Sequence, residues 1–247
     1  MCGRFVRKTS ALAISDIFSC SLDTDELPIS FNVAPTSRVL GIVNSMGGSS
    51  VVSFSWGLVP RWAPDASRAA SLINARIETV AEKPSFRDLV AQHRCVLPMD
   101  GYFEWKEQLR HDAMKPIKQP YYFSAHSQSR YSHQGVLAVA GLWTVWKDPN
   151  QSDGQVVQTA VALTTDANDM VSQVHHRMPV LLDRSGVANW LDDKNINPLA
   201  QIQVVDNEAL VVCAVSTKVN SSRNNGSELI EPIDLIQTEL LGELKLF

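Results

Sequence analysis

Short segments rich in branched and aromatic residues recur along most of the chain, and they limit the folds that it can adopt. Residues of these types favour β-strands. The segments are residues 94–97, 102–106, 121–125, 136–146, 156–164 and 209–215. Two further strands are predicted at residues 38–43 and 51–56, on either side of a turn in which Gly47 and Gly48 supply flexible backbone.

Helical patterns interrupt these strands irregularly. We expect helices at residues 9–20, 84–93, 166–174, 184–191 and 232–244. Thr9 or Ser10 can cap the first helix, and Thr165 or Asp166 can cap the third. Because helices do not alternate strictly with strands, the pattern predicts an α+β fold: a curved, mostly antiparallel β-sheet or barrel-like core flanked by helices. There is no internal repeat, heptad array or long linker, so residues 1–247 are interpreted as a single domain.

The composition excludes several classes of protein. Hydrophobic residues make up 45% of the chain and charged residues 19%, which is typical of a globule with a sizeable core. No apolar run approaches the roughly 20 residues that span a bilayer, and the start lacks the apolar core of a secretory signal. A net charge of −4 argues against indiscriminate coating of nucleic acid, but arginines in the first hundred positions leave room for a local basic groove.

The cysteines indicate the redox compartment. Cys2, Cys20, Cys95 and Cys213 are scattered, with no C-x-x-C pair, so neither a zinc site nor a disulfide scaffold is predicted. We expect a cytoplasmic, monomeric protein that has no metal or other cofactor and no contact with a membrane.

The cysteine at position 2 is the residue on which the chemistry is predicted to centre. Initiator methionine is usually removed when the next side chain is small, so Cys2 would become the first residue. A terminal cysteine carries an α-amine with a pKa of about 7.7–8.0 and a thiol with a pKa of about 8.5 on adjacent carbons. Such an aminothiol condenses with an aldehyde to an imine, and the sulfur then closes a five-membered thiazolidine ring. Taken alone, Cys2 is as well explained as an incidental residue in a frayed tail.

Polar residues gather at the expected ends of strands and helices in a few further segments. These are residues 31–36, residues 56–62 with 73–78, residues 98–106, and residues 164–168 with 174–179.

Together with the opening Met1-Cys2-Gly3-Arg4-Phe5, these segments resemble the SOS response-associated peptidase family. That family includes bacterial members and the eukaryotic hydroxymethylcytosine-binding protein of embryonic stem cells. The resemblance continues through residues 215–216 and 226–233, so it covers nearly the whole chain as one family domain. It implies binding of single-stranded DNA and covalent capture of abasic sites through the terminal cysteine. It also implies that the protein removes its own Met1, acts in the DNA damage response and, in a bacterium, joins the nucleoid on damage.

The resemblance also assigns the site residues. The nucleophile maps to Cys2, with Asn74, Glu104 and His175 as its polar partners. The residues implied to contact DNA are Arg4, Pro35, Trp56, Trp62, Arg76, Trp105, Thr164 and Arg177. Where some relatives have a second aromatic residue after Trp62, this chain has Ala63, which weakens the case for stacking at that spot.

The residue types are consistent with these roles when they are considered separately. Glu104 lies between Phe103 and Trp105, whose apolar side chains can raise its pKa towards a proton-transfer role. Without the motif, Glu104 would be interpreted as a solvent-facing strand residue. His175 can hold or move protons near the sugar, although adjacency does not show whether His175 or His176 points inward. Asn74 offers a donor and an acceptor, but a residue of this kind usually belongs to a loop.

The arginines and tryptophans have alternative explanations as well. Guanidinium groups at Arg4, Arg76 and Arg177 suit planar contacts to phosphates, whereas most arginines form weak surface ion pairs. Trp56, Trp62 and Trp105 can stack on bases, but at least one of them is expected to be ordinary core. Trp143, Trp146 and Trp190 are assigned to the core.

These observations give three ordered hypotheses. The first is a DNA-damage protein that forms a thiazolidine with abasic sites in single-stranded DNA. The second is a thiol peptidase or amidase that acts on other proteins, for which no oxyanion-hole donors can be identified. The third is a non-covalent reader of nucleic acid or modified bases, in which Cys2 is incidental.

Overall fold

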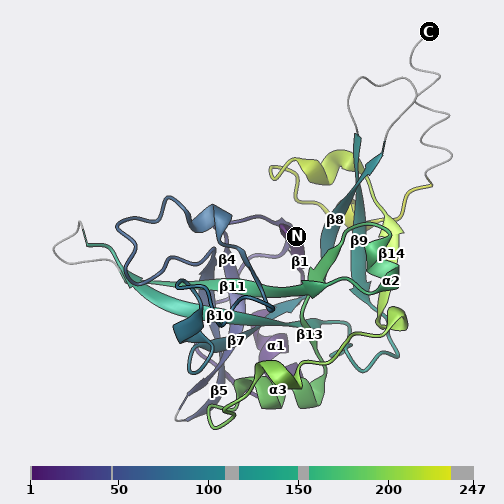
Figure 1. Cartoon of the computed structure of the whole chain (residues 1–247). Coiled ribbons are helices and arrows are strands. Elements are labelled where there is room, and N and C mark those ends of the chain that lie inside the picture. Colours follow the sequence, from purple (N-terminus) through teal and green to yellow (C-terminus); the bar gives the residue numbers. More distant parts are fainter. Residues whose placement is uncertain (1, 46, 109–116, 150–155, 235–247) are drawn as a thin grey trace.

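Strands make up most of the regular secondary structure in the computed structural model, which describes residues 2–45, 47–108, 117–149 and 156–234 (Figure 1). The strands are β1 (Arg4–Arg7), β2 (Ser21–Leu22), β3 (Ser30–Val33), β4 (Arg38–Ser45), β5 (Gly48–Trp56), β6 (Asn74–Arg76), β7 (Arg94–Met99), β8 (Gly101–Gln108), β9 (Ile117–Ala125), β10 (Leu137–Lys147), β11 (Val156–Asp166), β12 (Arg177–Pro179), β13 (Leu181–Leu182) and β14 (Leu210–Ala214). The helices are α1 (Ala11–Phe18), α2 (Asp169–Ser172) and α3 (Arg184–Leu191). Short 3-10 turns occupy Ala69–Ser71, Arg87–Leu89, Leu199–Gln201, Asn207–Ala209, Thr217–Asn220 and Ser227–Ile230.

The larger sheet closes on itself. Its strands follow the order β12-β11-β10-β7-β4-β5-β2, and β11 also pairs with β5 in parallel. The strands β5, β4, β7, β10 and β11 therefore form a barrel, since each pairs with two neighbours in the ring. The short strands β6 and β12 add to β11 beyond this ring. The barrel-like core predicted from the sequence is confirmed.

The smaller sheet is antiparallel throughout and follows the order β14-β9-β8-β1-β3. Its inner face shares one hydrophobic cluster with the barrel, because Phe5 and Phe123 pack in the same cluster as Phe54 and Leu97. In Figure 1, β8, β9 and β14 stand beside the long strands β10 and β11, and α1 and α3 lie on the opposite side of the barrel. Within the described ranges, no helix is long and apolar enough to cross a membrane.

Local sequence explains the helix ends. The Ser10 hydroxyl accepts a hydrogen bond from the Ala13 N–H at 3.1 Å, which caps α1, and Ser19 in the left-handed conformation ends it. Asp183 caps α3 in the same way, accepting from the Gly186 N–H at 2.7 Å. The α3 bounds match the prediction, and α1 is two residues shorter at each end than the helix predicted at residues 9–20.

Two predicted helices need correction. Residues 84–93 contain only the Arg87–Leu89 3-10 turn. The helix predicted at residues 166–174 shrinks to α2, capped by Asn168, because strand pairing with β12 carries β11 as far as Asp166. Of the helix predicted at residues 232–244, only residues 232–234 are described; they are not helical, and Pro232 forms a bridge with Val215. Residues 235–244 lie outside the described residues.

Gly57 follows β5 and lets another segment pack directly on its backbone. Its φ is +132°, and a Cβ at this position would lie 2.4 Å from the carbonyl oxygen of Ala69. The Gly57 N–H also donates to the Ala160 carbonyl of β11 at 2.9 Å. This contact holds residues 57–73 against the barrel, immediately before β6.

We predict that Gly57→Ala lowers the free energy of unfolding by about 2 kcal/mol or more, because both the backbone conformation and the close contact become strained. Gly47→Ala is the control, since a Cβ there would meet nothing within 4 Å. Urea denaturation of both variants measures the difference. Equal stabilities would contradict this account of the packing.

Candidate active site

Four side chains from different parts of the chain meet where the two sheets join. Cys2 lies just before β1 and Glu104 lies on β8 of the smaller sheet, whereas Asn74 begins β6 on the barrel. His175 lies between α2 and β12. The Asn74 amide donates to the Cys2 carbonyl oxygen at 2.8 Å, and His175 Nδ1 lies 3.9 Å from Glu104 Oε1. The structure thus brings together all four residues that the sequence assigned to catalysis.

Strand register explains this convergence. β6 runs parallel to β11, with Asn74 opposite Ala162 and Arg76 opposite Thr164. β12 pairs on the other edge of the same stretch, with Arg177 opposite Asp166. One end of β11 therefore positions two short strands whose sequences show no strand periodicity of their own.

Burial sets the protonation behaviour of Glu104. Its side chain is only 2% exposed, and loss of solvation raises the pKa of its carboxyl group to about 7. Both the acid and the carboxylate are then present near neutral pH. Glu104 can therefore give and accept protons in one reaction cycle.

Cys2 lies beside Glu104 and is almost fully buried, with 1% of its surface exposed. Burial raises the pKa of its thiol, and the negative charge of Glu104 raises that pKa further. At neutral pH the sulfur is therefore held as a thiol, whose S–H points to the Arg4 carbonyl oxygen at 3.8 Å.

The Arg177 backbone fixes the orientation of the His175 ring. Nδ1 lies 3.0 Å from the backbone N of Arg177 and 3.2 Å from its carbonyl oxygen. Burial lowers the pKa of His175, which favours the neutral imidazole. His176, by contrast, is exposed and stacks on His175 with ring centroids 4.4 Å apart. His175 is the histidine next to Glu104.

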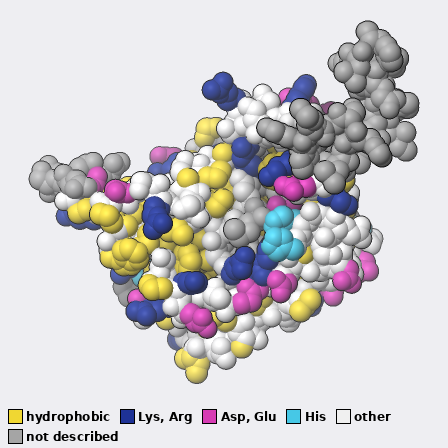
Figure 2. All heavy atoms as spheres, turned by 45° about the horizontal axis from the view of Figure 1, so that its top comes forward, with side chains coloured by type: hydrophobic (Ala, Val, Ile, Leu, Met, Phe, Trp, Pro, Cys, Tyr) yellow, Lys and Arg dark blue, Asp and Glu magenta, His cyan; other side chains and the backbone are white. Residues whose placement is uncertain are grey.

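Glu104 and His175 of this cluster line a hollow of about 800 Å³. Trp105, His176 and Asn220 are among its other lining residues. Figure 2 shows histidine side chains at the edge of the depression on this face, with Lys and Arg side chains on several sides of it. Within the described residues, no group of three or more His, Cys, Asp or Glu side chains is arranged to hold a metal ion.

Comparison with known proteins identifies the family. The family model described as SOS response associated peptidase (SRAP) matches residues 1–222. The chain belongs to this family. The "Abasic site processing protein YoqW" of Bacillus subtilis is 34% identical over 236 residues, which cover 94% of this chain and 99% of that protein.

A relative of lower identity and a solved structure are also similar to this chain. The "Abasic site processing protein HMCES" of Xenopus tropicalis is 29% identical over 242 residues, covering 87% of this chain and 69% of that protein. A crystal structure of a protein from Bacteroides thetaiotaomicron matches with a TM-score of 0.80 at 24% identity, covering 94% of this chain and 100% of that one. This last comparison shows the fold, which is α+β as the sequence predicted.

The three arginines that the SRAP pattern assigns to DNA have different surroundings. Arg76 is exposed. Arg4 is half-buried and donates through Nη1 to Asn32 Oδ1 at 2.8 Å and to the Val219 carbonyl at 3.1 Å. Arg76 is therefore the arginine most accessible to a phosphate.

Arg177 is almost fully buried. Its guanidinium binds both carboxylate oxygens of Glu78, at 2.9 and 2.8 Å, and also pairs with Asp166. A phosphate would have to compete with these carboxylates. Contact between Arg177 and DNA stays a prediction, and in this structure the side chain joins β12 to residues 76–78.

The tryptophans separate into core and surface residues. Trp56 is 0% exposed, its indole N–H donates to the Ile73 carbonyl at 3.0 Å, and it packs edge-on against Phe5. A side chain with no exposed face cannot stack on a base, so the assignment of Trp56 to DNA contact is corrected to the core. Trp62 is 68% exposed, and Trp105 lines the hollow while its indole donates to Asn220 Oδ1 at 2.6 Å.

The remaining predicted DNA contacts are less exposed. Pro35 is half-buried. Thr164 is fully buried, and its hydroxyl donates to the Ala75 carbonyl at 3.4 Å. Thr164 therefore shapes the site by fixing β6, and a direct contact with DNA stays a prediction.

Sequence reasoning missed several residues that support the site. Asn32 Nδ2 donates to the carbonyl groups of Val219, Ser221 and Asn224, which ties β3 to the segment after β14. Asp100 accepts hydrogen bonds from the Lys8 and Thr9 N–H groups at 2.6 and 3.0 Å, which fixes the end of β1. Both lie in motif segments, but only the folded chain shows what they bind.

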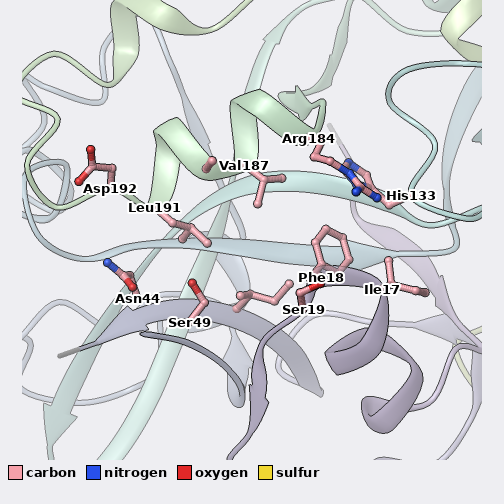
Figure 3. Close-up of a pocket in the computed structure, with 12 residues that line it drawn as sticks. Ile17, Phe18, Ser19, Asn44, Ser49, His133, Arg184, Val187, Leu191 and Asp192 are labelled. Carbon is pink, nitrogen blue, oxygen red and sulfur yellow. The ribbon is translucent and has the colours of Figure 1, made fainter. Parts of the chain in front are cut away.

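A second cavity, of about 460 Å³, lies on the other side of the barrel, between α1 and α3 (Figure 3). Ile17, Phe18 and Val187 give it apolar walls, and His133 and Arg184 lie together at one end. None of the predicted site residues lines this cavity, so the SRAP chemistry is assigned to the hollow over Glu104.

We predict that Glu104→Gln raises the free energy of unfolding relative to wild type, and that this difference grows as the pH rises from 5 to 8. The folded protein raises the pKa of Glu104 from 4.5 to about 7, so the contribution of the neutral acid is lost as the pH rises through that range. A pKa change of this size corresponds to about 3 kcal/mol. Urea denaturation at several pH values tests this.

Glu107→Gln is the matched control, since Glu107 lies on the same strand but is 67% exposed and paired with Lys118. A stability difference between Glu104→Gln and wild type that stays constant with pH would contradict the burial argument.

Proposed function

We propose that this protein binds single-stranded DNA and captures abasic sites through a thiazolidine formed by the amine and thiol of Cys2, shielding the lesion during the damage response. The observation that carries the proposal is the meeting of Cys2, Asn74, Glu104 and His175 beneath a hollow, with a carboxyl group whose pKa is about 7. The relatives named abasic site processing proteins support the same substrate.

Removal of Met1 is part of this proposal, because only then does Cys2 carry a free amine. The family is described as a peptidase, and we assign this cleavage to the protein itself. The Asn74 amide, bonded to the Cys2 carbonyl at 2.8 Å, holds the new chain end against the barrel.

The reaction requires proton transfer at each step. An abasic deoxyribose is mostly a closed hemiacetal, and Glu104 assists its opening to the aldehyde. The Cys2 amine then forms a bond to the aldehyde carbon, and the carbonyl oxygen takes up a proton. Glu104 protonates this hydroxyl, which leaves as water and gives the protonated imine. The Cys2 sulfur adds to the carbon of this iminium ion, the C=N π electrons return to the nitrogen, the thiol proton passes to the Glu104 carboxylate, and the ring closes.

The protonated thiol determines the order of these steps. Because burial raises the pKa of the Cys2 thiol, the sulfur is a weak nucleophile until Glu104 accepts its proton. The amine therefore attacks first. This order favours aldehyde capture over a thiol peptidase acting on other proteins, which needs a thiolate at the first step. By microscopic reversibility Glu104 also assists reopening of the ring and release of the DNA.

The proposed preference for single-stranded DNA is supported by two exposed residues outside the hollow. Trp62 can stack on a base without breaking a pair, and Arg76 is available for a phosphate. The covalent bond supplies permanence, so a modest non-covalent affinity suffices, in line with a net charge of −4.

We predict that Cys2→Ala abolishes the covalent adduct with an abasic single-stranded oligonucleotide, because the thiazolidine sulfur is lost. Denaturing gel electrophoresis measures the adduct without any reducing agent to trap an imine. Cys20→Ala is the control, since Cys20 is another free cysteine but lies inside the chain. A wild-type yield from Cys2→Ala would refute the mechanism.

We predict that Arg76→Ala weakens non-covalent binding of single-stranded DNA. The affinity should also depend less steeply on salt, by an amount that corresponds to the loss of about one phosphate contact. Fluorescence anisotropy at several salt concentrations measures both effects, with Cys2→Ala present in every protein so that no covalent adduct forms. Arg130→Ala removes the same charge, but Arg130 already lies near the carboxylates of Asp183 and Asp206. Equal losses for both variants would show a general charge effect and would remove Arg76 from the DNA contact.

A further inference from the structure

Tyr102 lies in the site but has no role in the mechanism given above. It is two residues from Glu104 on β8, so both side chains project from the same face of that strand. It pairs with Phe5 of β1 and packs in the same hydrophobic cluster as Cys2. Its ring stacks on Phe123 with centroids 5.0 Å apart and an interplanar angle of 8°, which fixes the direction of the hydroxyl.

The hydroxyl of Tyr102 is an exception to the rule that buried polar groups are hydrogen-bonded. The side chain is 0% exposed, and the hydroxyl has no hydrogen-bond partner among the described residues. Tyr122, on the neighbouring strand, shows the usual arrangement, because its hydroxyl donates to the Asp100 carbonyl at 2.9 Å. Asn74 Oδ1 is also buried without a partner in the described part of the chain. The site therefore holds an unused donor and an unused acceptor near Cys2.

Its surroundings keep the Tyr102 hydroxyl protonated, so that it remains a hydrogen-bond donor. Burial raises the pKa of Tyr102 well above its ordinary value, and negative charge on Cys2 or Glu104 raises it further. The phenol thus stays protonated throughout the pH range in which Glu104 titrates. A fixed neutral donor in a dry site stabilises an oxygen that gains negative charge in a transition state.

We propose that the Tyr102 hydroxyl donates a hydrogen bond to the oxygen on the sugar carbon that Cys2 attacks. As the Cys2 nitrogen bonds to this carbon, the π electrons of the carbonyl group move onto the oxygen. The hydrogen bond from Tyr102 stabilises that charge until the oxygen takes up the proton lost by the amine. Tyr102 keeps its own proton throughout, and Glu104 carries the proton transfers. This inference rests on the abasic-site capture proposed above.

The test is Tyr102→Phe, which removes only the hydroxyl. We expect adduct formation with an abasic single-stranded oligonucleotide to slow about tenfold or more at saturating DNA, with unchanged non-covalent affinity. The Tm is expected to equal or exceed that of wild type, because no protein hydrogen bond is lost. Tyr122→Phe is the matched control, and it is expected to lower the Tm while the rate changes less than twofold.

The outcomes separate this inference from the proposed function. If wild type forms no adduct, the proposed function fails. If wild type reacts and Tyr102→Phe reacts within twofold of its rate, the function stands and the role of Tyr102 is overturned. A slow variant with a lower Tm also counts against the role, since the hydroxyl would then make a structural hydrogen bond.

Discussion

The start of the chain is held between two sheets, and the rest of the site depends on this constraint. β1 pairs with β3 and β8 of the smaller sheet, and the Cys2 carbonyl accepts a hydrogen bond from Asn74 of the barrel at 2.8 Å. Residues near a chain terminus are usually mobile, whereas Cys2 is fixed by this hydrogen bond and by the pairing of the strand that follows it. Because this end lies at the junction of the sheets, its thiol is withdrawn from water and comes next to Glu104.

Loss of solvation then determines the chemistry. The same burial that raises the pKa of Glu104 to about 7 also keeps the Cys2 sulfur protonated. A carboxyl group that titrates near neutrality can serve both as acid and as base, and the thiol needs such a partner. This burial lowers the free energy of unfolding at neutral pH, since an ionised Glu104 disfavours the folded state. The Tyr102 hydroxyl and Asn74 Oδ1, both buried without a hydrogen-bond partner among the described residues, indicate the same compromise between stability and function.

The sequence predicted the long strands and the α+β class because branched and aromatic residues mark β4, β5, β7, β8, β10 and β11 directly. It did not predict β6 or β12, whose three residues form strands only because β11 offers both its edges to them. Helix length was overestimated at residues 84–93, and also at residues 166–174, where strand pairing of Asp166 with Arg177 outweighed local propensity. The motif segments located the catalytic residues, but only the folded chain shows that His175, rather than His176, lies next to Glu104.

One correct expectation rested on an incomplete reason. Phe103 and Trp105 were expected to raise the pKa of Glu104, but neighbouring residues on a strand point to the opposite face. Phe103 and Trp105 belong to a different hydrophobic cluster, whereas Cys2 and Tyr102 belong to the one on the Glu104 side. The burial of Glu104 is therefore a tertiary effect that no window of sequence displays. Trp56 was assigned to DNA contact for a related reason, since an aromatic residue in a motif does not reveal which face it occupies, although at least one of the three motif tryptophans was expected in the core.

Intact-mass spectrometry, before and after incubation with an abasic single-stranded oligonucleotide, tests the central claim most directly. The account predicts a purified protein that lacks Met1. It further predicts an adduct whose mass is the sum of protein and DNA less one water, and which persists without a reducing agent. A protein that retains Met1 and still forms this adduct, or a mature protein that forms none, would contradict it.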